Sequence, residues 1–382
     1  MACNGDIQKI KSPPKNKTSK KRKKKYIAWF IAICMIPITT AVASRFINPH
    51  PDVHVSVDIG DFINTHRDAF YQPEYGAWSH IDLHEMIAYC KNYLTDVLYM
   101  EWDEIIASAN NGDAEAQFLL GLFYITGEKG ILDVNEGIEW IRSAANQRLA
   151  MAQNMVGVFY ELGFFVTQDY AQSVEWIRLA AEQGLATAQL GLGRSYALGL
   201  GVHQSYHQAR TWWYRAASQG HAPSQVNLAI TYAMGNGITK NYNTAIQWFR
   251  LAADQGYAGA QYLLGYCYEN GFGVAQDYNQ AALWYRKSAN QGDRYAQTSL
   301  ALLYIHGNGI RQDFYEAVAL LYRAVEQRNE RAMGILGWLY HSGNGIIQNN
   351  ERAVYYYLNA ANHGNTDVFF TLRVHLKTTS KN

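Results

Sequence analysis

The stretch that decides the fold runs from Tyr257 to Gly292 and reads YAGAQYLLGYCYENGFGVAQDYNQAALWYRKSANQG. It consists of an alanine-bearing segment, a loop with glycines at positions 271 and 273, and a second segment that ends at Gly292. Glycine accepts the positive φ with which many helices end, so both loop and end positions are typical helix stops. The stretch therefore predicts two helices joined by a turn.

This unit recurs seven times between Asp113 and Gly364, in steps of 36 residues and without an insertion. Three columns of equivalent residues show the register. The first is Trp140, Trp176, Trp212, Trp248 and Trp284, completed by Leu320 and Tyr356. The second is Tyr124, Tyr160, Tyr196, Tyr232, Tyr268, Tyr304 and Tyr340. The third is Gln117, Gln153, Gln189, Gln225, Gln261 and Gln297, before Met333 breaks it. A fixed period of this length is the signature of a solenoid.

The residue types in these columns indicate packing. In the first segment, Leu264, Gly265 and Tyr268 recur at spacings of three or four, which places them on one helix face. Gly265 permits close helix approach, although glycine costs a helix roughly 1 kcal/mol relative to alanine. Because the tryptophan column recurs identically, we expect it to form the core of each repeat. Truncation of Trp248 to alanine should then lower the free energy of unfolding by roughly 3 to 5 kcal/mol.

The repeated residues resemble the sel-1-like repeat family, a relative of the tetratricopeptide repeats. The shared pattern is A-x-A-Q-x-x-L-G-x-x-Y-x-x-G-x-G-V-x-x-D-Y followed by A-x-x-W-Y-R-x-A-A-x-Q-G, and it covers 252 of 382 residues. The departures are Lys129 in the first copy, Leu320 and Arg328 in the sixth, and the missing glutamine and tryptophan of the last. The resemblance implies an all-α, right-handed α-solenoid of seven helix-turn-helix repeats over residues 113–364.

The region before the repeats has a strong charge asymmetry. Ten of the 33 basic residues fall within residues 1–25 against one acid, whereas the remaining chain has 23 basic and 31 acidic residues. Residues 26–44 are apolar and uncharged, and 19 residues are about enough for one transmembrane helix. The adjacent lysines predict that the basic head stays cytoplasmic and that the solenoid lies on the exported side. The sequence Ala41-Val42-Ala43 before Ser44 leaves a cleaved signal, and hence a secreted protein, as the alternative.

The remaining segments connect or close the solenoid. Residues 45–80 carry three prolines and are interpreted as a linker. Residues 81–112 are expected to form a helical N-terminal cap, and residues 365–382 a C-terminal capping helix with a polar tail.

Motifs for chemistry are weak. The four cysteines lie in four dissimilar settings without metal-ligand spacing, and His203 and His207 lack a third ligand for a metal. The glycine pairs recur without the lysine of a phosphate-binding loop, so a structural turn explains them better. We therefore expect no catalytic residues, no cofactor and no metal. The basic run beside an apolar segment is explained by topology, so we also expect no nucleic acid.

The expected function is protein binding by a non-enzymatic scaffold or adaptor. By resemblance to tetratricopeptide repeats, the first helices line a concave face through positions one or two residues from the repeated columns. The partner-binding residues expected there are Tyr262, Tyr266, Tyr295, Trp338, Arg194, Glu161, Glu269 and Phe118, and of these Tyr262, Tyr266 and Trp338 are expected to be partly exposed. Three alternatives stay open: a membrane-anchored regulator that signals to its cytoplasmic head, an adaptor in a eukaryotic lumen instead of a bacterial periplasm, and an enzyme.

Overall fold

The computed structural model describes residues 101–127, 130 and 132–363. All of these residues belong to one compact unit of the chain. The basic head, the apolar segment 26–44, the linker 45–80, residues 81–100 of the expected N-terminal cap and the expected C-terminal cap lie outside the described residues. Among the described helices, none has the length and apolarity needed to cross a bilayer.

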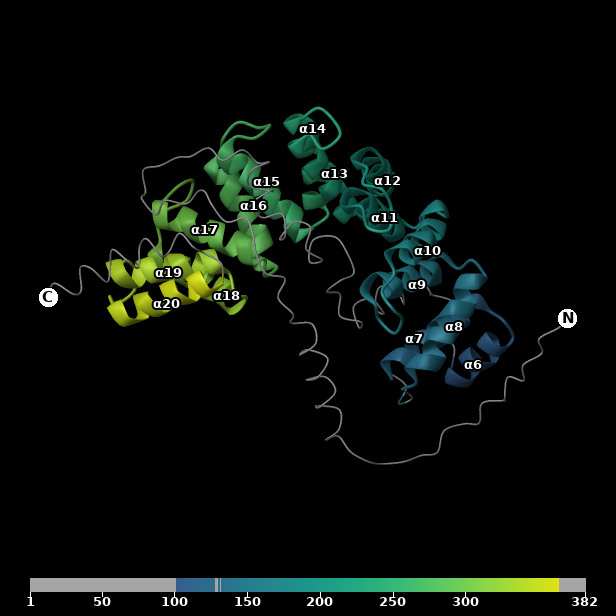
Figure 1. Cartoon of the computed structure of the whole chain (residues 1–382). Coiled ribbons are helices and arrows are strands. Elements are labelled where there is room, and N and C mark those ends of the chain that lie inside the picture. Colours follow the sequence, from purple (N-terminus) through teal and green to yellow (C-terminus); the bar gives the residue numbers. More distant parts are fainter. Residues whose placement is uncertain (1–100, 128–129, 131, 364–382) are drawn as a thin grey trace. The chain divides into compact units, whose positions relative to one another are not determined.

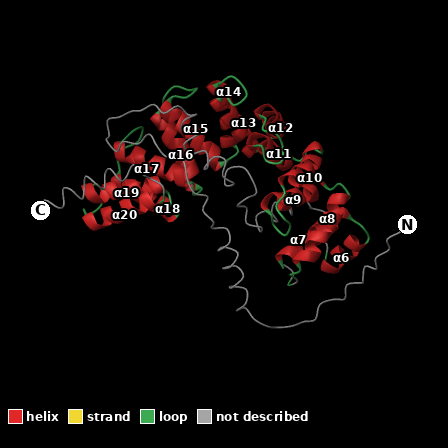
Figure 2. Cartoon of the chain, viewed as in Figure 1, coloured by secondary structure: helices red, strands yellow, loops and turns green. Residues whose placement is uncertain are grey.

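The described residues form helices and connecting loops, and no strand is found among them (Figures 1 and 2). Helix α6 spans Trp102–Asn110, and seven pairs follow it. They are α7 (Ala114–Thr126) with α8 (Val134–Asn146), α9 (Ala150–Leu162) with α10 (Tyr170–Glu182), α11 (Ala186–Leu198) with α12 (Tyr206–Ser218), α13 (Ala222–Met234) with α14 (Tyr242–Asp254), α15 (Ala258–Asn270) with α16 (Tyr278–Asn290), α17 (Arg294–His306) with α18 (Phe314–Glu326), and α19 (Glu330–Ser342) with α20 (Asn350–Asn362). The prediction of seven helix pairs in one register is confirmed.

Each helix packs against the next along the chain, from α6 to α20, which makes the described part an all-α solenoid. The glycine loops end the first helices as the sequence predicts. In the fifth pair, Gly271 ends α15 with φ 74° and Gly273 follows with φ 65°. The next helix begins at an aspartate cap, since the side chain of Asp277 accepts from the backbone N–H groups of Asn279 and Gln280.

Close approach within each pair depends on a glycine in the first helix facing a large residue in the second. A Cβ atom added to Gly265 would lie 2.7 Å from Cδ1 of Tyr285, which is closer than real atoms approach. Equivalent contacts pair Gly121 with Ile141, Gly157 with Ile177, Gly193 with Trp213 and Gly337 with Tyr357. The remaining two pairs have alanine at this position, Ala229 and Ala301, and both alanines are fully buried.

The expectation that the tryptophan column forms the core of each repeat is wrong for most repeats. Trp140, Trp176, Trp212 and Trp248 are only half-buried, and Trp284 alone is buried. The buried column is the next residue of each second helix, namely Ile141, Ile177, Trp213, Phe249, Tyr285, Leu321 and Tyr357, none more than 2% exposed. Neighbouring helix positions point about 100° apart, so only one of two adjacent columns can face the first helix directly.

In each of the first six repeats, the buried glutamine joins three helices. The amide of Gln225 donates to the carbonyl of Ala217 on the preceding second helix, at 3.2 Å. Its oxygen accepts from Gln255, the C-cap of its own second helix, at 2.8 Å. The same two bonds recur for Gln117, Gln153, Gln189, Gln261 and Gln297. Buried polar groups must be hydrogen-bonded to be tolerated, so these bonds fix the spacing between repeats.

A second contact ties neighbouring repeats through the tyrosine column. Arg250 of α14 donates to the hydroxyl of Tyr268 on α15, at 2.6 Å. Arg286 bonds Tyr304 in the same way at 3.1 Å, and the bond from Arg178 to Tyr196 is 3.4 Å long. The residue 18 positions before the tyrosine therefore repeats a contact across these junctions.

Two glycines of the same helix, α11, provide a matched test of close packing. A Cβ at Gly193 would lie 2.5 Å from Cδ1 of Trp213, whose indole N–H is held by the carbonyl of Leu190. A Cβ at Gly191 would make ordinary contact with Ile177 at 3.7 Å. We expect Gly193→Ala to lower the free energy of unfolding by about 1 to 3 kcal/mol through overpacking. Gly191→Ala should leave it unchanged or raise it by up to about 1 kcal/mol. Urea denaturation measures both, and equal effects would contradict this packing.

Candidate functional site

The eight residues expected to bind a partner differ in exposure. Phe118, Tyr262 and Tyr266 are buried, with 0%, 2% and 8% of their surface exposed. The expectation that Tyr262 and Tyr266 are partly exposed is therefore wrong. The ring of Tyr262 packs against Tyr285 and Tyr295, and the ring of Tyr266 packs against Phe272. The half-buried members of the set are Glu161, Arg194, Glu269, Tyr295 and Trp338.

All eight residues lie on first helices. Seven occupy a few recurring places, and Tyr295 of α17 lies three positions before the place that Tyr262 holds in α15. In α15 they are Tyr262, Tyr266 and Glu269, spaced by four and three residues, so they share one helix face. Glu161 of α9 is equivalent to Glu269, and Arg194 of α11 is equivalent to Tyr266. We call this face the first-helix stripe. Its residue types change from repeat to repeat, unlike the glutamine and tyrosine columns.

The stripe contains a cluster formed by Tyr262, Glu269, Tyr285 and Tyr295, which we call the tyrosine–glutamate cluster. The rings of Tyr262 and Tyr285 lie 5.7 Å apart, and those of Tyr262 and Tyr295 lie 6.0 Å apart. The hydroxyl of Tyr285 donates to Oε2 of Glu269 at 2.5 Å. Burial and the charge of Glu269 raise the pKa of Tyr285 well above its usual value, so the phenol keeps its proton and remains a donor.

Tyr285 belongs to this cluster although the sequence analysis placed it only in the repeat core. The position does face the core, because its ring packs against Gly265 in the first helix. Only here does that buried column carry a hydroxyl that reaches a carboxylate on the stripe, because Tyr357, the other tyrosine of the column, has a buried hydroxyl without a partner. The signal in the sequence was a tyrosine 16 residues after a glutamate.

A second part of the stripe is an ion pair between Glu161 and Arg194 across two repeats. The carboxylate of Glu161 accepts from the guanidinium of Arg194, and their side chains are 12% and 14% exposed. Burial lowers the pKa of Arg194 to about 10, which still leaves it charged at neutral pH. Its Nε atom is buried without a hydrogen-bond partner. The pair combines two residues that the sequence analysis singled out separately.

Trp338 and Phe118 do not join either group. Phe118 lies inside the core formed by α6 to α9, where it is fully buried. Trp338 packs half-buried against the core of the last repeats. The structure therefore brings together Tyr262, Tyr295 and Glu269 in one place, and Glu161 with Arg194 in another.

Other chemistry-bearing side chains are separate from the stripe. No group of three metal-ligating side chains occurs in the part of the chain that the structure describes. His203 and His207 are exposed, one in the loop before α12 and one inside it. Cys267 is buried, and burial raises the pKa of its thiol, so the thiolate that reacts as a nucleophile is disfavoured.

The repeat geometry agrees with comparisons to known proteins. The family model of the Sel1 repeat matches seven times, at residues 114–149, 150–185, 186–221, 222–257, 258–293, 294–329 and 331–365. The chain belongs to the Sel1 repeat family. The resemblance seen in the sequence is thereby confirmed, and proteins of this family generally mediate protein–protein interaction.

Two solved structures are similar over most of the chain. A protective antigen of uropathogenic Escherichia coli with an SLR fold shares 35% identity over 72% of this chain, with a TM-score of 0.65. The match spans 58% of the length of that antigen. A Sel1 repeat protein from Oxalobacter formigenes shares 32% identity, covering 64% of this chain and 96% of its own, with a TM-score of 0.58. The comparison with curated proteins found no match.

The Glu161–Arg194 pair gives a prediction for stability. Glu161→Gln leaves the buried guanidinium without its carboxylate, and we expect it to lower the free energy of unfolding by about 3 kcal/mol. The double variant Glu161→Leu with Arg194→Met removes both charges and should recover most of that loss. Chemical denaturation measures both variants. A single variant as stable as the parent would show that the pair contributes nothing to the stripe.

Proposed function

We propose that this chain is a non-enzymatic scaffold that binds a protein partner on the first-helix stripe. The observation that carries the proposal is the difference between the repeated positions and the variable positions of the repeats. The glutamine, glycine and tyrosine columns are occupied by bonds and packing within the solenoid. The variable positions carry half-buried Glu161, Arg194, Glu269, Tyr295 and Trp338.

These residue types suit recognition of a polypeptide. Tyrosine, tryptophan and arginine dominate the binding energy of most protein interfaces. In the tyrosine–glutamate cluster, the bond from Tyr285 to Glu269 and the ring contacts of Tyr262 fix the side chains before a partner arrives. Preorganised side chains lose less conformational entropy on binding, which favours affinity.

We further propose that residues 26–44 tether the solenoid to a membrane, with the basic head in the cytoplasm. The support is the uncharged apolar stretch that follows the lysine-rich head. The description of the Escherichia coli relative as a protective antigen favours an exported position. Amino-terminal sequencing of the mature protein separates the two readings, because an intact terminus fits the anchor and a start at Ser44 fits a cleaved signal.

Binding can be tested with variants chosen for their exposure. Tyr295→Ala and Trp338→Ala remove half-buried aromatic rings, and each should weaken capture of a partner by about 1 to 2 kcal/mol. Tyr315→Ala on α18 is the control, because that ring is 80% exposed and lies outside the stripe. The measurement is affinity capture by the full-length protein with quantitative mass spectrometry. Helix content is checked by circular dichroism. A partner retained equally by all variants would remove the stripe as its binding site.

A further inference from the structure

Three of the six junctions between repeats have the arginine–tyrosine contact, and the sixth repeat replaces it by a bond between the hydroxyls of Tyr322 and Tyr340. The junction of the third and fourth repeats has neither. Tyr214 of α12 occupies the place that Arg178, Arg250 and Arg286 hold in other repeats. The equivalent of Tyr268 at this junction is Tyr232 of α13, and among the described residues the hydroxyl of Tyr232 has no hydrogen-bond partner. Tyr214 itself is 55% exposed and turns toward Trp248, with ring centroids 6.1 Å apart. The junction of the third and fourth repeats therefore lacks a hydrogen bond from α12 to the hydroxyl of Tyr232, and we call it the open junction.

An arginine enters this junction from a column that is otherwise apolar. In the other repeats the position of Arg210 is held by Ile138, Val174, Ile246, Ala282, Val318 and Val354. Arg210 is half-buried and donates to the carbonyl of Gly237 at 3.3 Å. A guanidinium has five N–H donors, so this bond leaves several of them for another acceptor.

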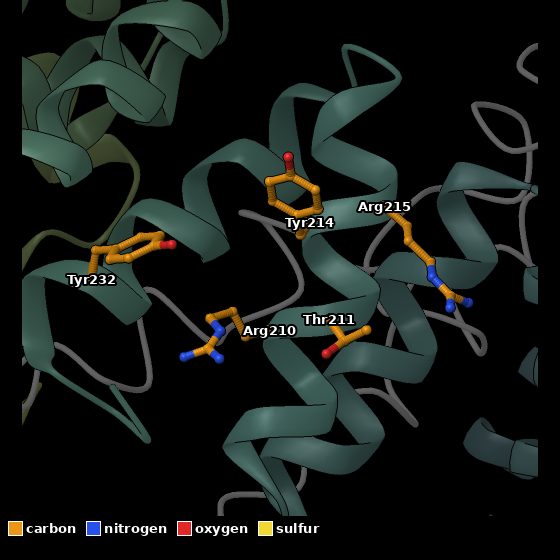
Figure 3. A pocket seen from close by; sticks show the side chains of 5 residues that line it. All are labelled: Arg210, Thr211, Tyr214, Arg215 and Tyr232. Carbon is orange, nitrogen blue, oxygen red and sulfur yellow. The ribbon is translucent and has the colours of Figure 1, made fainter. Parts of the chain in front are cut away.

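The open junction forms a cavity of about 350 Å³ lined by Arg210, Thr211, Tyr214, Arg215 and Tyr232. Figure 3 shows Tyr232 on a different helix from the other four side chains, with the guanidinium of Arg210 lying toward it. The guanidinium of Arg215 points away, and it lies over the ring of Trp212 at 4.4 Å. The hydroxyl of Thr211 already donates to the carbonyl of His207, at 3.0 Å. Arg210 and Tyr232 are therefore the donors that face the cavity, and its lining has no carboxylate.

The charge around the cavity is one-sided. Residues 183–253, which include the third repeat and the fourth repeat as far as Ala253, contain no aspartate or glutamate, and Asp254 follows at the end of α14. They contain five basic residues, namely Arg194, Arg210, Arg215, Lys240 and Arg250, in a chain that beyond residue 25 carries more acidic than basic residues. Within the part of the chain that the structure describes, neither Arg210 nor Arg215 forms an ion pair, so their charges are not neutralised.

We propose that this cavity is a binding site for an acidic peptide, with one carboxylate held by Arg210 and the hydroxyl of Tyr232. Arginine pairs with a carboxylate through strong charge-assisted hydrogen bonds. Tyr214 of the lining offers an apolar contact for a neighbouring peptide residue, because its ring is 55% exposed and lies beside Trp248. The site lies mainly on a second helix and is separate from the first-helix stripe. The proposal therefore does not depend on whether that stripe binds a partner.

A peptide fits this surface better than a nucleic acid does. Nucleic-acid binding draws on many phosphate contacts along a basic stripe. Here one arginine at an exceptional position faces one cavity, and the chain outside the head is acidic overall. A carboxylate with an apolar neighbour matches the arginine, the hydroxyl and the aromatic ring that line the cavity.

The test uses a variant that restores the ordinary repeat without changing net charge. Arg210→Val with Tyr214→Arg returns an apolar residue and the arginine that bonds the tyrosine elsewhere. The probe is a fluorescein-labelled hexaglutamate peptide, with hexaglutamine as its neutral twin, and fluorescence anisotropy measures binding to the full-length protein. The parent should bind hexaglutamate, more weakly at high salt, and the restored variant should bind it about tenfold less tightly. Arg323→Gln is the matched control, because Arg323 is exposed and occupies the position of Arg215 three repeats later.

Each outcome of these measurements either supports or overturns the proposed site. The site is supported if the restored variant loses binding while Arg323→Gln binds within about twofold of the parent. The restored variant has the same net charge as the parent, so its loss of binding would come from the changed cavity. Equal hexaglutamate binding by the parent and the restored variant overturns the site. The absence of parent binding, or binding of a single-stranded oligonucleotide through the same cavity in its place, overturns the acidic-peptide assignment. Thermal unfolding of each variant confirms that the comparison is made on folded protein.

Discussion

The solenoid depends on a buried glutamine that is bonded on both sides. Each one donates to the helix that precedes its repeat and accepts from the glutamine that caps its own second helix, as Gln225 does with Ala217 and Gln255. One side chain thereby fixes three helices. An unsatisfied amide at less than 10% exposure would cost about 1 to 3 kcal/mol, so the junctions tolerate little variation in spacing. Met333 breaks the column only in the last repeat, after six bonded junctions.

The sequence predicted the fold well because its strongest signals are periodic. The 36-residue step, the loop glycines and the aspartate, asparagine or serine that caps each second helix all agree with one another, and consistency across levels marks a foldable sequence. The core column was misplaced because Trp248 and Phe249 are adjacent and both apolar. Conspicuous repetition of tryptophan does not tell which of two neighbours faces the glycine helix. That choice depends on helix rotation, which the glycine contacts reveal.

The candidate sites were harder to predict because they lie where the repeat departs from its own pattern. The stripe residues Glu161 and Arg194 were identified separately, but their pairing requires knowledge of how neighbouring first helices align. Tyr262 was identified as a surface residue because its position varies, yet its ring packs against Tyr285 and Tyr295. Arg210 was overlooked because the sequence alone does not show that the hydroxyl of Tyr232, which lines the same cavity, lacks a hydrogen-bond partner. Variation between repeats therefore marks both packing adjustments and functional sites.

Native-state hydrogen exchange on a Gln225→Met variant tests the central claim that buried glutamines couple the repeats. Methionine fills the space without the two bonds and already occupies position 333. The account predicts a loss of protection of about 1 to 3 kcal/mol, concentrated in α12, α13 and α14 and fading in the repeats beyond them. Unchanged protection at this junction, or an equal loss in every repeat, would contradict it.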